Sequence, residues 1–210
     1  GLSVKGAFSE TIIKSMSEKP IIFAMANPDP EITPEEVADI RSDAIMATGR
    51  SDYPNQVNNV LGFPYIFRGA LDVQASEIND AMKLAAANAI AYLAREDVPD
   101  EVNAAYGKPL QFGKEYIIPA PFDPRLIVKV SSEVARAAMK TGVARKPIEN
   151  FEIYEQELKA RLNPTANSLN RIYSRVKRAP KRVVFAEGEE ERVIRAAISF
   201  QASGYGQPIL

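Results

Sequence analysis

Short apolar runs and a helical pattern alternate over the first 50 residues. Residues 20–26 form a continuous apolar run of strand length, which is typical of a parallel strand buried on both faces, and residues 44–48 form the next strand. Between them, Thr33 and Pro34 begin a helix, because Thr is a good N-cap and Glu36 completes a capping box. A strand–helix–strand order with short connections favours a doubly wound α/β fold.

The middle of the chain has a helical pattern. Apolar residues at helical spacing predict an amphipathic helix over 77–96, with one face made by Ile78, Met82, Ala85, Ala89 and Tyr92. A second helix, carrying Val130, Val134 and Ala138, should end at Gly142. The Gly- and Pro-containing stretch 99–124 between them is expected to be irregular. Shorter helices are expected at 151–162 and 166–178, and from Ser9 as N-cap to Met16.

A second α/β unit begins near the end of the chain. Residues 183–186 form an apolar strand, Glu187 and Gly188 turn the chain into a helix, and residues 207–210 look like the start of another strand. The helix carries Val193, Ile194, Ala197 and Ile198. A domain boundary near residues 179–180 fits this order. Both chain ends look cut, since the first residue is not Met and the last strand has only begun.

The composition excludes several kinds of chemistry. The chain has no Cys and no His, so disulfides, thiolates and imidazole bases are absent. A net charge of −1 gives no overall attraction to nucleic acid or to acidic membranes. No apolar run approaches the roughly 20 residues that would span a bilayer. Neither a nucleic-acid nor a membrane partner is therefore expected.

One segment departs from this neutral balance. Between Leu158 and Ala186 there is no acidic residue, but there are eight basic ones: Lys159, Arg161, Arg171, Arg175, Lys177, Arg178, Lys181 and Arg182. A solvated linker helix, docked on an acidic neighbouring surface, explains this pattern. Phosphate binding, for coenzyme A or for nucleic acid, is the alternative.

Polar residues follow the predicted strands where ligands bind in open parallel sheets, beyond the carboxyl ends. Three such exits occur: residues 1–3 (if a strand precedes them), 27–28 and 49–51. Asn27 is the sharpest candidate, because its amide both donates and accepts and Pro28 restricts its direction. A simple turn at Asn27 is the alternative.

The loop over 51–59 is dense in amides, which suit a small hydroxy acid whose charge is met elsewhere. The alternative is a polar loop that caps the helix near Pro64. Arg50 and Arg68 could each hold a carboxylate through two hydrogen bonds, or could form ion pairs within the protein. No paired carboxylates stand at a telling spacing, so the residues alone predict no metal site.

These segments resemble one family over essentially the whole chain. The sequences FAMANP at 23–28 and TGRSDYPNQVNNVL at 48–61 resemble malic enzymes, as do residues 31–34, 63–64, 67–72, 116–119 and 121–126. The sequence PKRVVFAEGEEERV at 180–193 is similar to the start of phosphotransacetylase domains. This junction is typical of the bacterial hybrid malic enzymes.

The resemblance implies a C-terminal part of a Rossmann-like doubly wound parallel sheet over 1–142. A helical basic linker over 143–180 and the start of a phosphotransacetylase-like domain over 181–210 would follow. It implies oxidative decarboxylation of malate to pyruvate and carbon dioxide, with NADP (or NAD) as hydride acceptor and Mg²⁺ or Mn²⁺ as Lewis acid. Asn27 and Asn58 match residues that contact malate, and Ser3, Asn27 and Asn59 match the cofactor-contacting positions.

The resemblance also implies what this chain lacks. The family's Tyr and Lys acid–base pair, its metal ligands and its Gly-rich phosphate turn lie upstream, so no catalytic or metal-binding residue is assigned and the chain alone should be inactive. A cytoplasmic homo-oligomer with acetyl-CoA as effector is expected. The alternatives are a non-catalytic assembly or regulatory module that binds acetyl-CoA, and a phosphate acetyltransferase.

Overall fold

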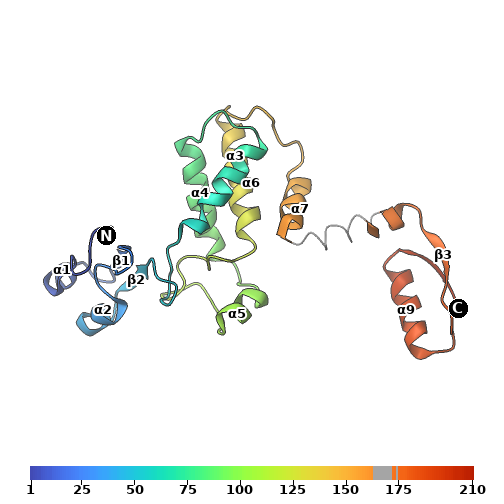
Figure 1. Cartoon of the computed structure of the whole chain (residues 1–210), viewed down its shortest axis with the longest axis horizontal. Coiled ribbons are helices and arrows are strands. Elements are labelled where there is room, and N and C mark those ends of the chain that lie inside the picture. The colour runs from blue at the N-terminus through green and yellow to red at the C-terminus, as the bar shows by residue number, and fades with distance from the viewer. Residues whose placement is uncertain (163–171, 174) are drawn as a thin grey trace. The chain divides into compact units, whose positions relative to one another are not determined.

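The computed structural model describes residues 1–162, 172–173 and 175–210 (Figure 1). Two compact units make up the chain, residues 1–156 and residues 157–210. The helix predicted over 166–178 lies partly outside the described residues. Within the described part of the chain, no helix combines the length and apolar character needed to cross a membrane.

The first unit begins with the predicted α/β segment. Strands β1 (Ile21–Ala24) and β2 (Ile45–Thr48) are parallel neighbours, with Ile21 opposite Ile45 and Ala24 opposite Thr48. This confirms the two predicted strands and their order in the sheet.

The helix starts predicted at Ser9 and Thr33 are confirmed as well. Helix α1 (Glu10–Ser15) has Ser9 as its N-cap. Helix α2 (Pro34–Ile40) begins with the expected capping box, in which Thr33 and Glu36 each accept the other's backbone N–H. Side chains from both helices form one core with alternate residues of β1: Ile13, Ile22, Ala24 and Val37 are all buried.

The expectation that the first strand is buried on both faces was wrong for this chain. Ile22 and Ala24 are buried, whereas Ile21 is 59% exposed and Phe23 is 38% exposed. The reason is that the core containing α1 and α2 covers only the face to which Ile22 and Ala24 point.

A helical layer follows the sheet. Helices α3 (Phe63–Asp72), α4 (Asp80–Leu93) and α6 (Leu126–Lys140) lie side by side (Figure 1). Gly69 permits the approach of α3 to α6, because a Cβ there would lie 2.9 Å from Cβ of Val134. Helix α7 (Phe151–Leu162) is present where it was predicted. Helix α6 ends at Lys140, close to the predicted end at Gly142, and Gly142 adopts the left-handed conformation.

Two helical predictions need correction. Tyr92, expected on the buried face of α4, is 68% exposed, and the core instead receives Met82, Ala86, Ala89 and Leu93. Residues 99–124, expected to be irregular throughout, contain α5 (Asp100–Tyr106). Acidic residues in its first turn and a left-handed Gly107 at its end explain why this segment is helical.

The second unit contains a strand–helix–strand segment. Strand β3 (Lys181–Val184) pairs in parallel with β4 (Gly206–Ile209), and α9 (Glu191–Ala202) connects them. A parallel pair requires such a crossover. The second α/β segment is therefore confirmed, although β3 begins two residues before the predicted residues 183–186.

Candidate functional site

The three predicted strand exits lie at one edge of the sheet. The backbone N–H of Met25 donates to the carbonyl of Gly1 at 3.0 Å, so the first residues run beside the end of β1. Since β1 and β2 are parallel, residues 27–28 and 49–51 leave the sheet in the same direction. Ligands of open parallel sheets bind at such an edge.

A pocket of about 240 Å³ occupies this edge. Its lining comes from two exits: Ala26, Asn27, Pro28, Gly49, Arg50, Ser51, Asp52 and Gln56. Asn27 is exposed, and its side-chain amide makes no hydrogen bond to any residue that the structure describes. Asn27 is therefore available to a ligand.

Asn58 and Asn59 lie further along the same loop and do not line this pocket. The Asn58 side-chain oxygen accepts the N–H of Val60 at 3.0 Å and caps a short 3₁₀ helix, η1 (Asn59–Leu61). Its amide nitrogen has no hydrogen-bond partner within the described ranges. Asn59 is exposed at the first position of η1. The structure thus brings Asn27 together with the 49–56 part of the loop, but not with Asn58 inside one pocket.

Ser3 stands at the first exit. Its backbone N–H donates to the Glu31 carboxylate at 2.8 Å, and the N–H of Ala26 donates to the other oxygen of that carboxylate at 3.1 Å. Burial raises the pKa of Glu31, but backbone hydrogen bonds, chiefly those from Ser3 and Ala26, together with the nearby N-terminal ammonium hold the pKa below its ordinary value. Sequence reasoning did not select Glu31 as a site residue, although it lies just after two prolines and begins the 31–34 segment of the family resemblance.

The conformation of the amide-dense loop depends on Asn55, which sequence reasoning did not single out. Asn55 is 6% exposed. Its amide nitrogen donates to the carbonyls of Met46 (2.8 Å) and Lys114 (2.9 Å), and its oxygen accepts the N–H of Ile117 (2.8 Å). Its φ of 56° lies in the left-handed region, which Asn tolerates better than most residues. Asn55 therefore joins β2, the loop and the 114–117 segment.

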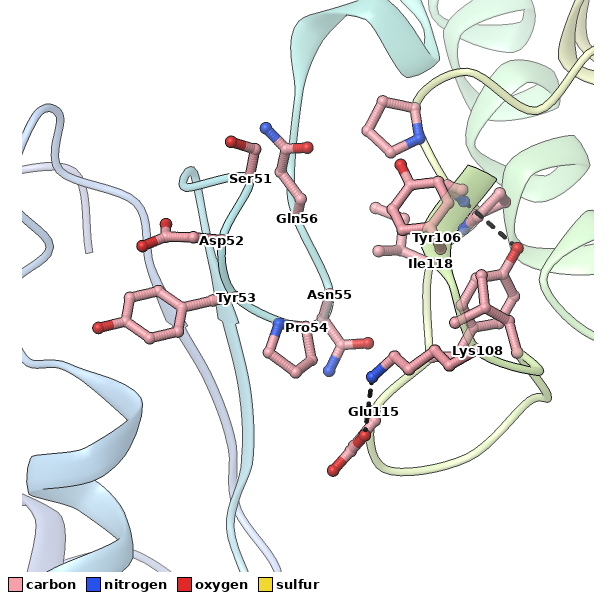
Figure 2. A pocket seen from close by; sticks show the side chains of 15 residues that line it. Ser51, Asp52, Tyr53, Pro54, Asn55, Gln56, Tyr106, Lys108, Glu115 and Ile118 are labelled. Carbon is pink, nitrogen blue, oxygen red and sulfur yellow. Dashed lines mark hydrogen bonds and ion pairs between the residues drawn. The ribbon is translucent and has the colours of Figure 1, made fainter. Parts of the chain in front are cut away.

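The same loop borders a second cavity of about 180 Å³. Figure 2 shows residues 51–56 on one side of it, with Tyr106, Lys108 and Ile118 opposite. The Lys108 ammonium pairs with Glu115 at 3.4 Å. The loop thus separates this cavity from the pocket that contains Asn27, with which it shares Ser51, Asp52 and Gln56.

The two candidate arginines already have carboxylate partners. Arg50 donates to both oxygens of Asp52, at 2.9 and 2.6 Å, and the pKa of Arg50 is raised by this hydrogen-bonded carboxylate. Arg68 pairs with Asp72, which also accepts the Tyr154 hydroxyl at 2.9 Å. Both arginines therefore form ion pairs within the protein, which was the alternative to binding a ligand carboxylate.

The basic stretch contributes to the surface of the second unit. The Lys177 ammonium lies 5.3 Å from the centre of the Tyr205 ring, which stacks on Tyr173 at 4.9 Å. Strand β3, which carries Lys181 and Arg182, is exposed along its length. Arg171 lies outside the described residues.

Comparisons with known proteins give two family matches. Residues 1–106 match the model of the malic enzyme NAD binding domain, and residues 167–210 match that of phosphate acetyl/butaryl transferase. The whole chain is 66% identical to the NADP-dependent malic enzyme of Rhizobium meliloti and 49% identical to the NAD-dependent malic enzyme of the same organism. In both cases it spans 28% of the relative's length.

Solved structures agree with these matches. The malic enzyme from Pyrococcus horikoshii is 42% identical with a TM-score of 0.63, and the alignment covers 80% of this chain and 36% of that one. The Entamoeba histolytica malic enzyme is 30% identical with a TM-score of 0.64, over 96% of this chain and 37% of that one.

Proposed function

Because the chain belongs to the malic enzyme family, whose NAD-binding domain matches residues 1–106, we propose that it forms part of an enzyme that oxidatively decarboxylates malate. The products are pyruvate and carbon dioxide, and NADP or NAD is reduced. Relatives named for each cofactor align with the whole chain, so both belong to the proposal. The observation that carries it is the family match over the segment that forms the Asn27 pocket.

The lining of the pocket fits the nicotinamide end of such a cofactor. Asn27 offers an unpaired amide, which can both donate to and accept from the carboxamide of nicotinamide. In this proposal Ser3, Asn27 and Asn59 contact the cofactor, while Asn27 and Asn58 orient malate. Neutral amides add no charge, so they can donate hydrogen bonds to malate, its carboxylate oxygens included, while cationic groups elsewhere balance its charge.

The acid–base and metal chemistry belongs to other residues of the full-length enzyme. A bound Mg²⁺ or Mn²⁺ supplies Lewis-acid polarisation of the substrate hydroxyl. Within the described part of this chain, no group of three or more Asp, Glu, His or Cys side chains could hold such an ion. As the family resemblance implies, we assign the metal ligands and the acid–base pair to residues outside this chain, and expect the 210-residue chain alone to be inactive.

The test is malate-dependent reduction of NADP and of NAD by the full-length protein with Mn²⁺, followed by the absorbance of the reduced cofactor. Asn27→Ala should lower kcat/KM for malate and raise KM for the cofactor, each by about tenfold or more. Asn88→Ala, at an exposed position of α4, is the matched control and should change neither. Absence of reduction with both cofactors would contradict the proposal.

A second function is proposed for the end of the chain, because residues 167–210 match the phosphate acetyl/butaryl transferase family. We propose that this segment begins a domain that binds acetyl-CoA as an effector and supports assembly of a homo-oligomer. Acetyl-CoA should then change malate turnover, whereas formation of acetyl-CoA from acetyl phosphate and CoA would favour an active transferase. A cytoplasmic location completes the proposal and rests on the resemblance alone.

A further inference from the structure

Glu31 is a buried carboxylate with two backbone partners on different strand exits. Only 1% of the Glu31 surface is exposed to solvent. Oε1 accepts the N–H of Ser3, at the first exit, and Oε2 accepts the N–H of Ala26, which directly precedes Asn27. The backbone carbonyl of Glu31 also accepts the N–H of Gly6 at 2.8 Å. One side chain therefore connects the two exits that flank the end of β1.

The burial of this charge needs an explanation, since an ionised carboxylate is costly to remove from water. No Lys or Arg side chain pairs with Glu31 among the residues described, and backbone amides satisfy it instead. An apolar residue would fill the same space without that desolvation cost. What a carboxylate alone supplies here is two acceptor oxygens at a fixed separation, each directed at one exit.

The packing around the carboxylate leaves little freedom. A Cβ at Gly1 would collide with Oε1 of Glu31 and lie 2.9 Å from the Phe8 ring. Only glycine therefore allows the first segment to approach the carboxylate this closely. The first segment is thus held beside the end of β1 by the carboxylate and by the Gly1 carbonyl, which accepts the Met25 N–H.

We propose that Glu31 is a positioning residue for the dinucleotide and malate, acting through the backbone of Ser3 and Ala26. The inference rests on the proposed function, in which Ser3 and Asn27 contact the cofactor. Because Ala26 directly precedes Asn27, anchoring the Ala26 N–H holds the backbone at the residue before the one from which the Asn27 side chain extends. Rates of this kind of reaction are sensitive to displacements of about 1 Å.

The test uses the full-length protein with Glu31→Gln, which keeps the size of the side chain. Its single oxygen can accept only one of the two amides, and its NH₂ group faces the other N–H. KM for the cofactor should rise by about ten- to a hundredfold, with a parallel rise in the dissociation constant of NADPH or NADH measured by fluorescence. Gly1→Ala, which crowds the same carboxylate from the opposite side, should change KM in the same direction.

Glu36→Gln is the matched control. In the wild type the Glu36 carboxylate also accepts a backbone N–H, that of Thr33 at 2.8 Å, but this bond belongs to the capping box of α2. This variant should lower the melting temperature while leaving both KM values unchanged. A merely structural role for Glu31 would produce the same pattern as Glu36, namely lower stability and a lower active fraction with unchanged KM and unchanged affinity.

The outcomes separate this inference from the proposed function. If the wild type oxidises malate and Glu31→Gln retains its KM and cofactor affinity, the positioning role is wrong and the function stands. If the wild type binds the cofactor without oxidising malate, the function fails, and weaker cofactor binding by Glu31→Gln still supports the positioning role. A wild type that neither reacts nor binds the cofactor overturns both.

Discussion

Replacing Asn55 should release the amide-dense loop from the rest of the first unit. Asn55→Ala removes three hydrogen bonds that reach residues 46, 114 and 117. Each net hydrogen bond contributes about 1 kcal/mol, and more where a buried partner is left unpaired. Ala also tolerates the left-handed backbone less well than Asn, at about 1 kcal/mol. The local opening free energy of this region should therefore fall by about 3–5 kcal/mol.

Hydrogen exchange of the full-length protein measures this local free energy. The Ile117 amide is the reporter, because its acceptor is the Asn55 side chain. Asn55→Gly keeps the backbone conformation but loses the hydrogen bonds, so exchange should accelerate by about 30- to 1000-fold, the equivalent of about 2–4 kcal/mol. Asn55→Ala should exceed this by the backbone cost. Asn55→Asp should also accelerate exchange, because its carboxylate would face the carbonyls of Met46 and Lys114.

Asn103→Ala provides the control. Asn103 also bridges two backbone groups, accepting the Leu110 N–H at 2.8 Å and donating to the Val98 carbonyl at 3.3 Å. Its replacement should accelerate exchange at Leu110 and leave Ile117 unchanged. Unchanged protection of Ile117 in Asn55→Gly would refute the reasoning, because the loop would then be held by other contacts.

Three further predictions concern separate parts of the chain. In the full-length enzyme, Asn58→Ala should lower kcat/KM for malate by about ten- to a hundredfold. Wild-type kinetics would contradict this prediction. If only Asn59→Ala lowers kcat/KM, the role belongs to Asn59 instead. The Arg41 guanidinium and the Lys19 amide hold the pKa of Asp43 below its ordinary value of 3.8, so Asp43 stabilises the fold above that pH and loses its effect as the pH falls. Asp43→Asn should therefore flatten the acid side of a melting-temperature profile, and an unchanged slope would contradict this. Replacing Arg175, Lys177 and Arg178 by Glu should leave basal malate turnover unchanged but alter assembly or the response to acetyl-CoA. A large fall in basal turnover of the assembled protein would argue against this.

Features that depend on neighbours in the sequence were predictable. The Thr33 capping box closes within three residues, and the two strands were visible as apolar runs whose parallel pairing followed from the helix between them. The exits of parallel strands share one edge, so the common location of Asn27 and the 49–51 exit followed from the same pattern. Helix α5 was missed, although Asp100, Glu101 and Gly107 carried its start and stop signals, because the surrounding Gly and Pro residues outweighed them.

Features that depend on distant partners were not predictable. Glu31 and its partner Ser3 are 28 residues apart in the sequence, and Asn55 reaches Lys114 over 59 residues. The pattern of apolar and polar residues does not indicate such a contact, because an acidic or amide residue in a loop has similar neighbours in the sequence whether or not it has a distant partner. The exposure of Tyr92 has a related cause: Ala85, Ala89 and Tyr92 share a helical spacing, but the position of α6 decides which side of α4 is buried.

The two candidate asparagines differ in how much of the amide remains free, and this difference bears on their proposed roles. The oxygen of Asn58 is committed to the Val60 N–H, which orients the side chain and leaves the NH₂ group as a pure donor. A donor without an acceptor beside it suits a carboxylate, which only accepts. Asn27 retains both its donor and its acceptor, as a neutral carboxamide requires. In the proposed roles, the cap at η1 leaves the Asn58 NH₂ group as a donor toward the substrate's carboxylate, while the uncapped Asn27 can both donate to and accept from the amide of the cofactor.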